Sequence, residues 1–135
     1  MSSVENSLGE KRKAVESAII AMLENEIPSV TWTRLFKGFQ RGKGVVGSLV
    51  SDRIDFKYDS KNQLLATARY VLIIADSENT DSVDDIADIA FELLDNDNLD
   101  GNAIICEVKS IQYAAAPNRD DAGAVFLVCE VKFYV

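Results

Sequence analysis

The first residues that could do chemistry form a GxGxxG motif between Gly42 and Gly47. Such a motif binds the pyrophosphate of a dinucleotide when a strand precedes it and a helix follows it, because the helix N-terminus then faces the phosphates. Here the following residues, 50–58, alternate between apolar and polar types, which is typical of a strand. We therefore expect residues 38–48 to form a mobile, glycine-rich basic loop that becomes ordered on a partner, and not a dinucleotide site.

A second candidate is a calcium-binding loop that starts at Asn96. Asn98 and Asp100 occupy the next ligand positions, Gly101 occupies the turn position, and Glu107 is the twelfth residue. In that motif the last ligand comes from an exiting helix, whereas residues 103–113 predict a strand. An Asn/Asp/Gly turn that ends a helix explains the same residues, and we favour that interpretation.

Acidic side chains are concentrated between residues 76 and 100, where there are ten carboxylates and no base, a net charge of −10. Four of them fall at helical spacing on the face expected to point away from the core: Asp84, Asp88, Glu92 and Asp95. Like charges four residues apart cost about 0.2–0.5 kcal/mol per pair. A solvated face is the simplest interpretation, and contact with a basic surface or a magnesium site remain alternatives.

Basic side chains are concentrated in the preceding segment, residues 34–57. Six bases against Asp52 and Asp55 give a net charge of +4, and the bases are Arg34, Lys37, Arg41, Lys43, Arg53 and Lys57. Two opposite patches on one chain suit a head-to-tail contact between copies, in which each patch meets a different patch of the next copy. The alternatives are that the patches meet within one subunit or face water.

The overall composition excludes several classes of function. The sequence has no histidine, which removes Ser-His, Cys-His and His-metal chemistry. A net charge of −8 argues against general binding of nucleic acid or anionic membranes. Cys106 and Cys129 lie in apolar runs, so we expect buried, reduced thiols and no metal pair. Residues 1–6 lack the pattern of a signal peptide, and no apolar run is long enough to span a membrane, so we expect a cytoplasmic protein. We expect no cofactor.

Two helices must carry or flank these segments. Helical spacing of apolar residues predicts the first from Ser3 to Glu26, which Pro28 ends because the residue before a proline avoids the helical region. The second follows Ser82 and Asp85, whose spacing resembles a capping box, and it ends at the turn over residues 96–101.

The remaining residues predict five strands, at 30–39, 50–58, 63–75, 103–113 and 124–135. The order α-β-β-β-α-β-β predicts a single α+β domain over residues 1–135, with a mainly antiparallel sheet covered on one face by two helices. The last strand should be central or well packed. The expected core comprises Val125, Leu127, Val131, Phe133, Ile104, Val108, Leu72, Ile74, Ile19 and Met22.

This order of elements, the chain length and the final strand GAVFLVCEVKFYV (residues 123–135) resemble the tail terminator proteins of tailed bacteriophages, which the lambda tail terminator typifies. The resemblance covers nearly the whole chain: a helix with a proline stop, three strands with a long loop, an Asp-rich helix and a closing strand pair. It implies a structural virion protein, not an enzyme. No catalytic residue is carried over.

The resemblance also implies the partners. Such proteins form a ring, typically a hexamer, that caps the tail tube, ends its polymerisation and presents the surface to which the head docks. The partners would be further copies of the chain, the tail tube protein, a head-tail connector protein and DNA that passes without sequence-specific binding. The protein would be assembled in the host cytoplasm and reside in the tail. The alternative is a small binding module that contacts nucleic acid through the basic residues 34–57, and a magnesium enzyme ranks third.

Overall fold

Two helices and five strands make up the computed structural model, which describes residues 3–34, 44–76, 83–115 and 122–135. In chain order they are α1 (Ser3–Glu26), β1 (Thr31–Thr33), β2 (Val45–Tyr58), β3 (Leu64–Asp76), α2 (Val83–Leu94), β4 (Ile105–Ala115) and β5 (Ala122–Tyr134). The predicted order α-β-β-β-α-β-β and the α+β class are confirmed. Neither described helix is long and apolar enough to cross a membrane.

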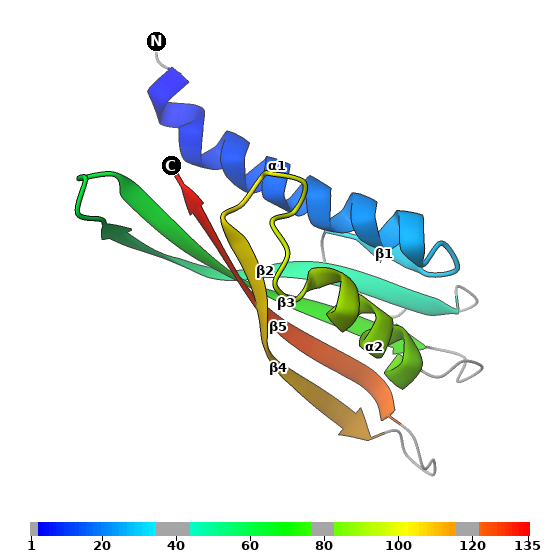
Figure 1. Ribbon diagram of the computed structural model, residues 1–135. Helices are drawn as coiled ribbons and strands as arrows, with labels where there is room; N and C mark the ends of the chain where they lie inside the picture. The colour runs from blue at the N-terminus through cyan, green and yellow to red at the C-terminus, as the bar shows by residue number, and fades with distance from the viewer. Residues whose placement is uncertain (1–2, 35–43, 77–82, 116–121) are drawn as a thin grey trace.

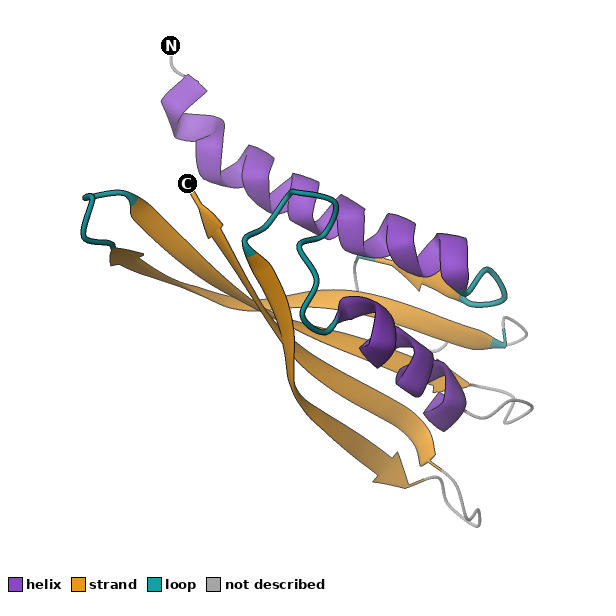
Figure 2. Ribbon diagram, viewed as in Figure 1, coloured by secondary structure: helices purple, strands orange, loops and turns teal. Residues whose placement is uncertain are grey.

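The five strands form one sheet in the order β1-β2-β3-β5-β4. The four long strands pair antiparallel, and the short β1 pairs parallel with β2. Both helices lie on the same face of the sheet, as Figures 1 and 2 show. The predicted architecture, a mainly antiparallel sheet with one helix-covered face, is therefore confirmed. Strand β5 lies between β3 and β4, so its predicted interior position is also confirmed.

The core lies between the helices and the covered face of the sheet. Leu72 of β3 is directly opposite Leu127 of β5, and both are fully buried. From the helix layer, Ile19 and Leu23 of α1 pack into the same cluster together with Leu94 of α2. Apolar residues at helical spacing in α1 and α2, and alternating apolar residues in the strands, thus meet at one interface. Their burial there supplies most of the driving force for folding.

Most of the predicted core residues are buried, but three are not. Seven are confirmed: Val125, Leu127, Val131, Phe133, Leu72, Ile74 and Ile19. Val108 and Met22 are half-buried, and Ile104 is 50% exposed. The sequence predicts Ile104 within a strand, whereas β4 begins one residue later, so the side chain of Ile104 leaves the turn toward solvent instead of entering the core.

The segment before β2 and the start of β2 bear on two predictions. The strand expected over residues 30–39 is confirmed at Thr31–Thr33, and residues 35–39 lie outside the described residues. The loop expected over residues 38–48 is wrong for Val45–Ser48, which lie in β2 and pair with both β1 and β3. This segment extends β2 because its residues Val46–Ser48 pair in parallel with β1, and no local sequence pattern indicates that pairing. The rest of that expected mobile loop, residues 38–43, lies outside the described residues.

The end of β2 extends past the helix-covered part of the sheet. Residues Arg53–Gln63, which we call the arm, comprise the last six residues of β2 and the turn to β3. An irregularity between Ser51 and Arg53 shifts the register there, so that Ile54, Phe56 and Tyr58 lie on the helix side. Phe56 and Tyr58 nevertheless remain 49% and 64% exposed. Figure 1 shows the arm projecting beyond α2.

Candidate assembly surfaces

The glycine motif has a packing explanation at its last position. Gly47 lies in β2, opposite Trp32 of β1, and a Cβ at Gly47 would collide with the indole ring. The ring is held there because its Nε1–H donates a hydrogen bond to the Ile27 carbonyl over 3.0 Å. Since a strand and not a helix follows Gly44, the backbone offers no helix N-terminus for a pyrophosphate. The prediction that this motif is not a dinucleotide site is supported by that geometry.

The calcium-like loop is a turn that ends α2. Asn96, Leu99, Asp100 and Gly101 all have positive φ, and the Asp97 carboxylate accepts a hydrogen bond from the Leu99 N–H over 2.7 Å. Glu107 lies in β4, where it forms an ion pair with Lys109 over 3.4 Å. No group of three ligating side chains suited to a metal occurs among the described residues. The positive φ angles and the hydrogen bond between Asp97 and Leu99 confirm the turn interpretation.

Two acidic residues next to α2 cover part of the edge of β4. The Asp97 backbone forms an isolated bridge with Cys106, with N···O distances of 3.2 and 2.6 Å. The Asp95 carboxylate accepts a hydrogen bond from the Val108 N–H over 2.9 Å. The prediction that Asp95 is on a solvated face is therefore wrong: this side chain is half-buried because it satisfies a strand amide.

The acidic residues of α2 itself mostly face solvent. Asp85, Asp88 and Glu92 are exposed, whereas Asp84 is half-buried with one buried carboxylate oxygen that has no partner among the described residues. The expected outward face is thus confirmed for Asp88 and Glu92. Because α2 packs over β5, β3 and β4, these carboxylates lie toward the β4 side of the sheet.

The basic residues are dispersed along the opposite side of the sheet. Arg34 follows β1, and Arg53 and Lys57 lie on the arm, all exposed. Arg53 pairs with Asp55 over 3.2 Å. Lys37, Arg41 and Lys43 lie outside the described residues. The described bases of this segment therefore lie at two places, next to β1 and on the arm.

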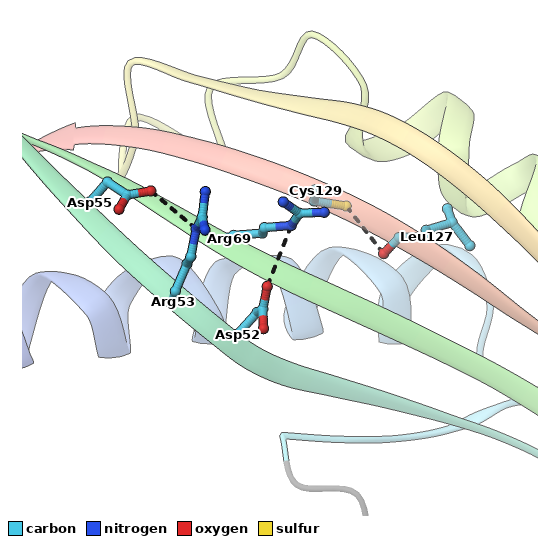
Figure 3. A network of polar contacts seen from close by, with 6 residues as sticks. All are labelled: Asp52, Arg53, Asp55, Arg69, Leu127 and Cys129. Atoms are coloured by element: carbon cyan, nitrogen blue, oxygen red, sulfur yellow. Dashed lines mark hydrogen bonds and ion pairs between the residues drawn. The ribbon is translucent and has the colours of Figure 1, made fainter.

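Arg69 is a charged residue that sequence reasoning missed. It stands directly opposite Arg53 across β2 and β3, and its guanidinium pairs with Asp52 over 3.4 Å. Figure 3 shows the two arginines side by side, each with its own carboxylate partner. Like charges opposite one another are unfavourable, and the two carboxylates offset that cost. Only the strand register, and no sequence spacing, could have revealed this pair.

Within the described part of the chain, the acidic residues of α2 form no ion pair with the basic residues of β1 and β2. The ion pairs there join Arg12 to Glu16 within α1 and bases to neighbouring acids of β2, β3 and β4. None of them links α2 to β1 or β2. Since β1 and β2 lie at one edge of the sheet and β4 at the other, the two segments present their charges on opposite sides.

The cysteines and the hollow regions offer no chemistry of their own. Cys106 and Cys129 are free and buried, as predicted. A hydrogen bond with Cys106 and burial raise the pKa of the Cys129 thiol, which keeps it protonated and unreactive. Two shallow hollows of about 330 and 460 Å³ share Ala14 of α1 and Asn102 of the turn, and mostly small side chains line the larger one.

Comparisons with known proteins add little. No family model matches the chain, and no curated protein matches it. One solved structure aligns with 92% of this chain and 94% of its own, at 18% sequence identity and a TM-score of 0.46. A likeness at that level carries no argument about function.

Proposed function

We propose that this chain is a structural protein of the tail-terminator class, and not an enzyme. It closes into a ring, a hexamer by the resemblance, on the end of a phage tail tube, where it ends tube polymerisation and presents the head-docking surface. Its partners are further copies of itself, the tube protein and the head-tail connector protein, and DNA passes through without sequence-specific contacts. It is assembled in the host cytoplasm and resides in the virion tail.

The observation that carries this proposal is the separation of charge across the sheet. Exposed carboxylates of α2 lie toward the β4 side, and Arg34 and Lys57 lie on the β1–β2 side. A closed ring needs a heterologous contact, in which two different surfaces of one chain meet in neighbouring copies. Opposite charges on those surfaces steer association and fix its register, while buried apolar area supplies most of the affinity.

The test is charge reversal on α2, read out as oligomer mass in solution. Asp88→Lys with Glu92→Lys should raise the protein concentration needed for assembly by at least about tenfold at low salt, because like charges then face each other across the contact. Adding Arg34→Glu should partly restore assembly. The control, Glu10→Lys, reverses an exposed charge in the first half of α1, away from α2 and from Arg34, and should assemble normally.

Two results would contradict the proposal. Wild-type protein that stays at 14.9 kDa at every salt and concentration would exclude the ring. Rings that form equally well with the α2 charges reversed would show that charge separation does not hold the contact.

A further inference from the structure

Among the described residues, a strand edge without a neighbour lies at each side of the sheet. Strand β1 ends opposite Ser48, so no described strand lies beside the outer edge of β2 from Leu49 to Tyr58. Strand β4 forms the other edge of the sheet. Unpaired N–H and C=O groups along such edges are ready to pair with another strand.

The edge of β4 is open only in its second half. In the first half, the outward-facing backbone groups of Cys106 bond to the backbone of Asp97, and the Val108 N–H donates to the Asp95 carboxylate. An irregularity between Val108 and Ser110 follows, and another lies between Ala114 and Ala115. The regular stretch without an outer partner among the described residues is therefore Ser110–Ala114. On β2 the regular uncovered stretch is Arg53–Tyr58, of similar length.

The directions of the two edge strands match. Strands β2, β3, β5 and β4 alternate in direction across the sheet, so β4 runs opposite to β2. When a second copy is placed beside the first in the same orientation, as in a ring, its β2 lies antiparallel to β4 of the first. The helices of both copies then lie on the same face. A two-fold arrangement would pair each edge with itself instead.

We propose that Ser110–Ala114 of one copy pairs antiparallel with Arg53–Tyr58 of the next, so that the sheet continues from copy to copy. This inference rests on the proposed ring, because the occupant of each edge is a second copy of the chain. The two uncovered stretches favour that occupant, because they have similar lengths and run in opposite directions when two copies lie in the same orientation. Main-chain hydrogen bonds would supply affinity, as in other cases of strand addition.

Exposed side chains at both edges support the same partner. On the helix face of the arm, Phe56 and Tyr58 are 49% and 64% exposed, and on the helix face of β4, Tyr113 is 58% exposed. Residues opposite or diagonal across an antiparallel pair contact one another on one face. Pairing of the two stretches therefore brings these three aromatic side chains together and buries them.

Disulfide cross-linking tests both the contact and its direction. Cysteines are introduced on the open face, either Ser110→Cys or Gln112→Cys on β4, each combined with Arg53→Cys, Asp55→Cys or Lys57→Cys on β2. Oxidation of assembled protein should give ladders at multiples of 14.9 kDa on a non-reducing gel. In an antiparallel pair, moving the β4 cysteine from 110 to 112 must move its best β2 partner two residues toward the start of β2. The buried Cys106 and Cys129 should leave the wild-type background low.

Each outcome decides one question. Cross-linking with the opposite trend, or none while the mass still shows rings, overturns the strand pairing and leaves the ring intact. Ladders with the expected trend but open filaments in place of rings support the pairing and contradict the proposed function. Single-cysteine variants that cross-link to dimers indicate a two-fold contact and overturn the inference.

Discussion

Strand β5 and the arm have equally clear apolar alternation in sequence, but only one of them is buried. In β5, Leu127 and Val131 are fully buried beneath the helices. In the arm, Phe56 and Tyr58 face the same side of the sheet and are about half exposed or more. Alternation therefore decides which face a side chain takes, and the position of the helices decides whether that face is covered. An apolar residue that is correctly placed and left uncovered is a reason to look for a partner.

The largest expected change in stability distinguishes β5 from the arm. Leu127→Ala should lower the free energy of unfolding by about 2–5 kcal/mol, because it removes a fully buried side chain and leaves a cavity. Phe56→Ala is the matched change on the arm and should cost less than about 1 kcal/mol in dilute, unassembled protein. Urea denaturation of both variants gives the comparison. Equal losses would show that the arm is packed as firmly as the core.

The second prediction concerns the covered half of β2. Gly47→Ala should lower the free energy of unfolding by about 1–3 kcal/mol, because the new methyl group displaces the Trp32 ring. Trp32 is the only tryptophan, so its fluorescence should shift to longer wavelength as the ring gains exposure.

Gly9→Ala provides the control for that substitution. Gly9 lies in α1 with nothing near the added methyl group, and the change should stabilise the protein by about 0.5–1 kcal/mol through helix propensity. Unchanged fluorescence in Gly47→Ala would contradict the contact with Trp32.

A third prediction concerns Tyr70, in the covered half of β3. Its hydroxyl donates a hydrogen bond to the Glu16 carboxylate over 2.9 Å. Burial, and then the nearby Glu16 charge, raise the pKa of Tyr70. Because the pKa is raised, Tyr70 keeps its hydroxyl proton to higher pH in the folded state than in the unfolded state. The contribution of Tyr70 to the free energy of unfolding is therefore complete below the unfolded pKa of about 10 and declines as pH rises above that value.

Urea denaturation between pH 9 and 11 measures this effect. Wild-type stability should fall more steeply with pH than that of Tyr70→Phe, which has no proton to lose at that position. Parallel slopes would mean that Tyr70 titrates normally in the folded protein.

The smallest expected effect lies at the tip of the arm. The Asp59 carboxylate accepts hydrogen bonds from the Gln63 and Lys61 N–H groups, each over 2.9 Å. The bond from Gln63 is the main cause of its lowered pKa, and the Tyr134 hydroxyl contributes. The contribution of the Asp59 carboxylate to stability is therefore present above the unfolded pKa, near 4. It is lost as pH falls through the lower pKa of the folded state.

An NMR titration of the Asp59 carboxyl carbon measures this shift. Its midpoint should lie below the ordinary value, and Tyr134→Phe should leave most of the depression in place because the turn amides remain. A midpoint that returns to the ordinary value in Tyr134→Phe would assign the effect to the hydroxyl instead.

Local features of the fold could be predicted from the sequence. Both ends of α1 coincide with the predicted Ser3–Glu26, since apolar spacing and Pro28 act within a few residues. The turn over residues 96–101 follows from its Asn, Asp and Gly residues. The division of charge between two segments was visible because it is a property of composition along the chain.

Contacts between distant segments could not be predicted in this way. The parallel pairing of Trp32 with Gly47, the placement of Arg53 opposite Arg69, and the use of Asp95 to satisfy an amide of β4 all depend on sheet order and register. The uncovered edges of β2 and β4 could not be predicted either, because whether a strand lies at the edge depends on which other strands pair with it. Sequence spacing contains none of that information.

The interior position of β5 has a consequence for how the protein is made. Strands β2 and β3 are joined by a short turn and can pair as soon as both have emerged from the ribosome. The other side of β3, however, pairs with β5, and residues as distant in the chain as Leu72 and Leu127 must meet to complete the core. Until residues 122–134 have been synthesised, the apolar side of the β2–β3 hairpin and the helices lack their main partner. Non-local pairing of this kind is slow, so the apolar surface of β2, β3 and the helices is exposed to aggregation until β5 has paired with β3.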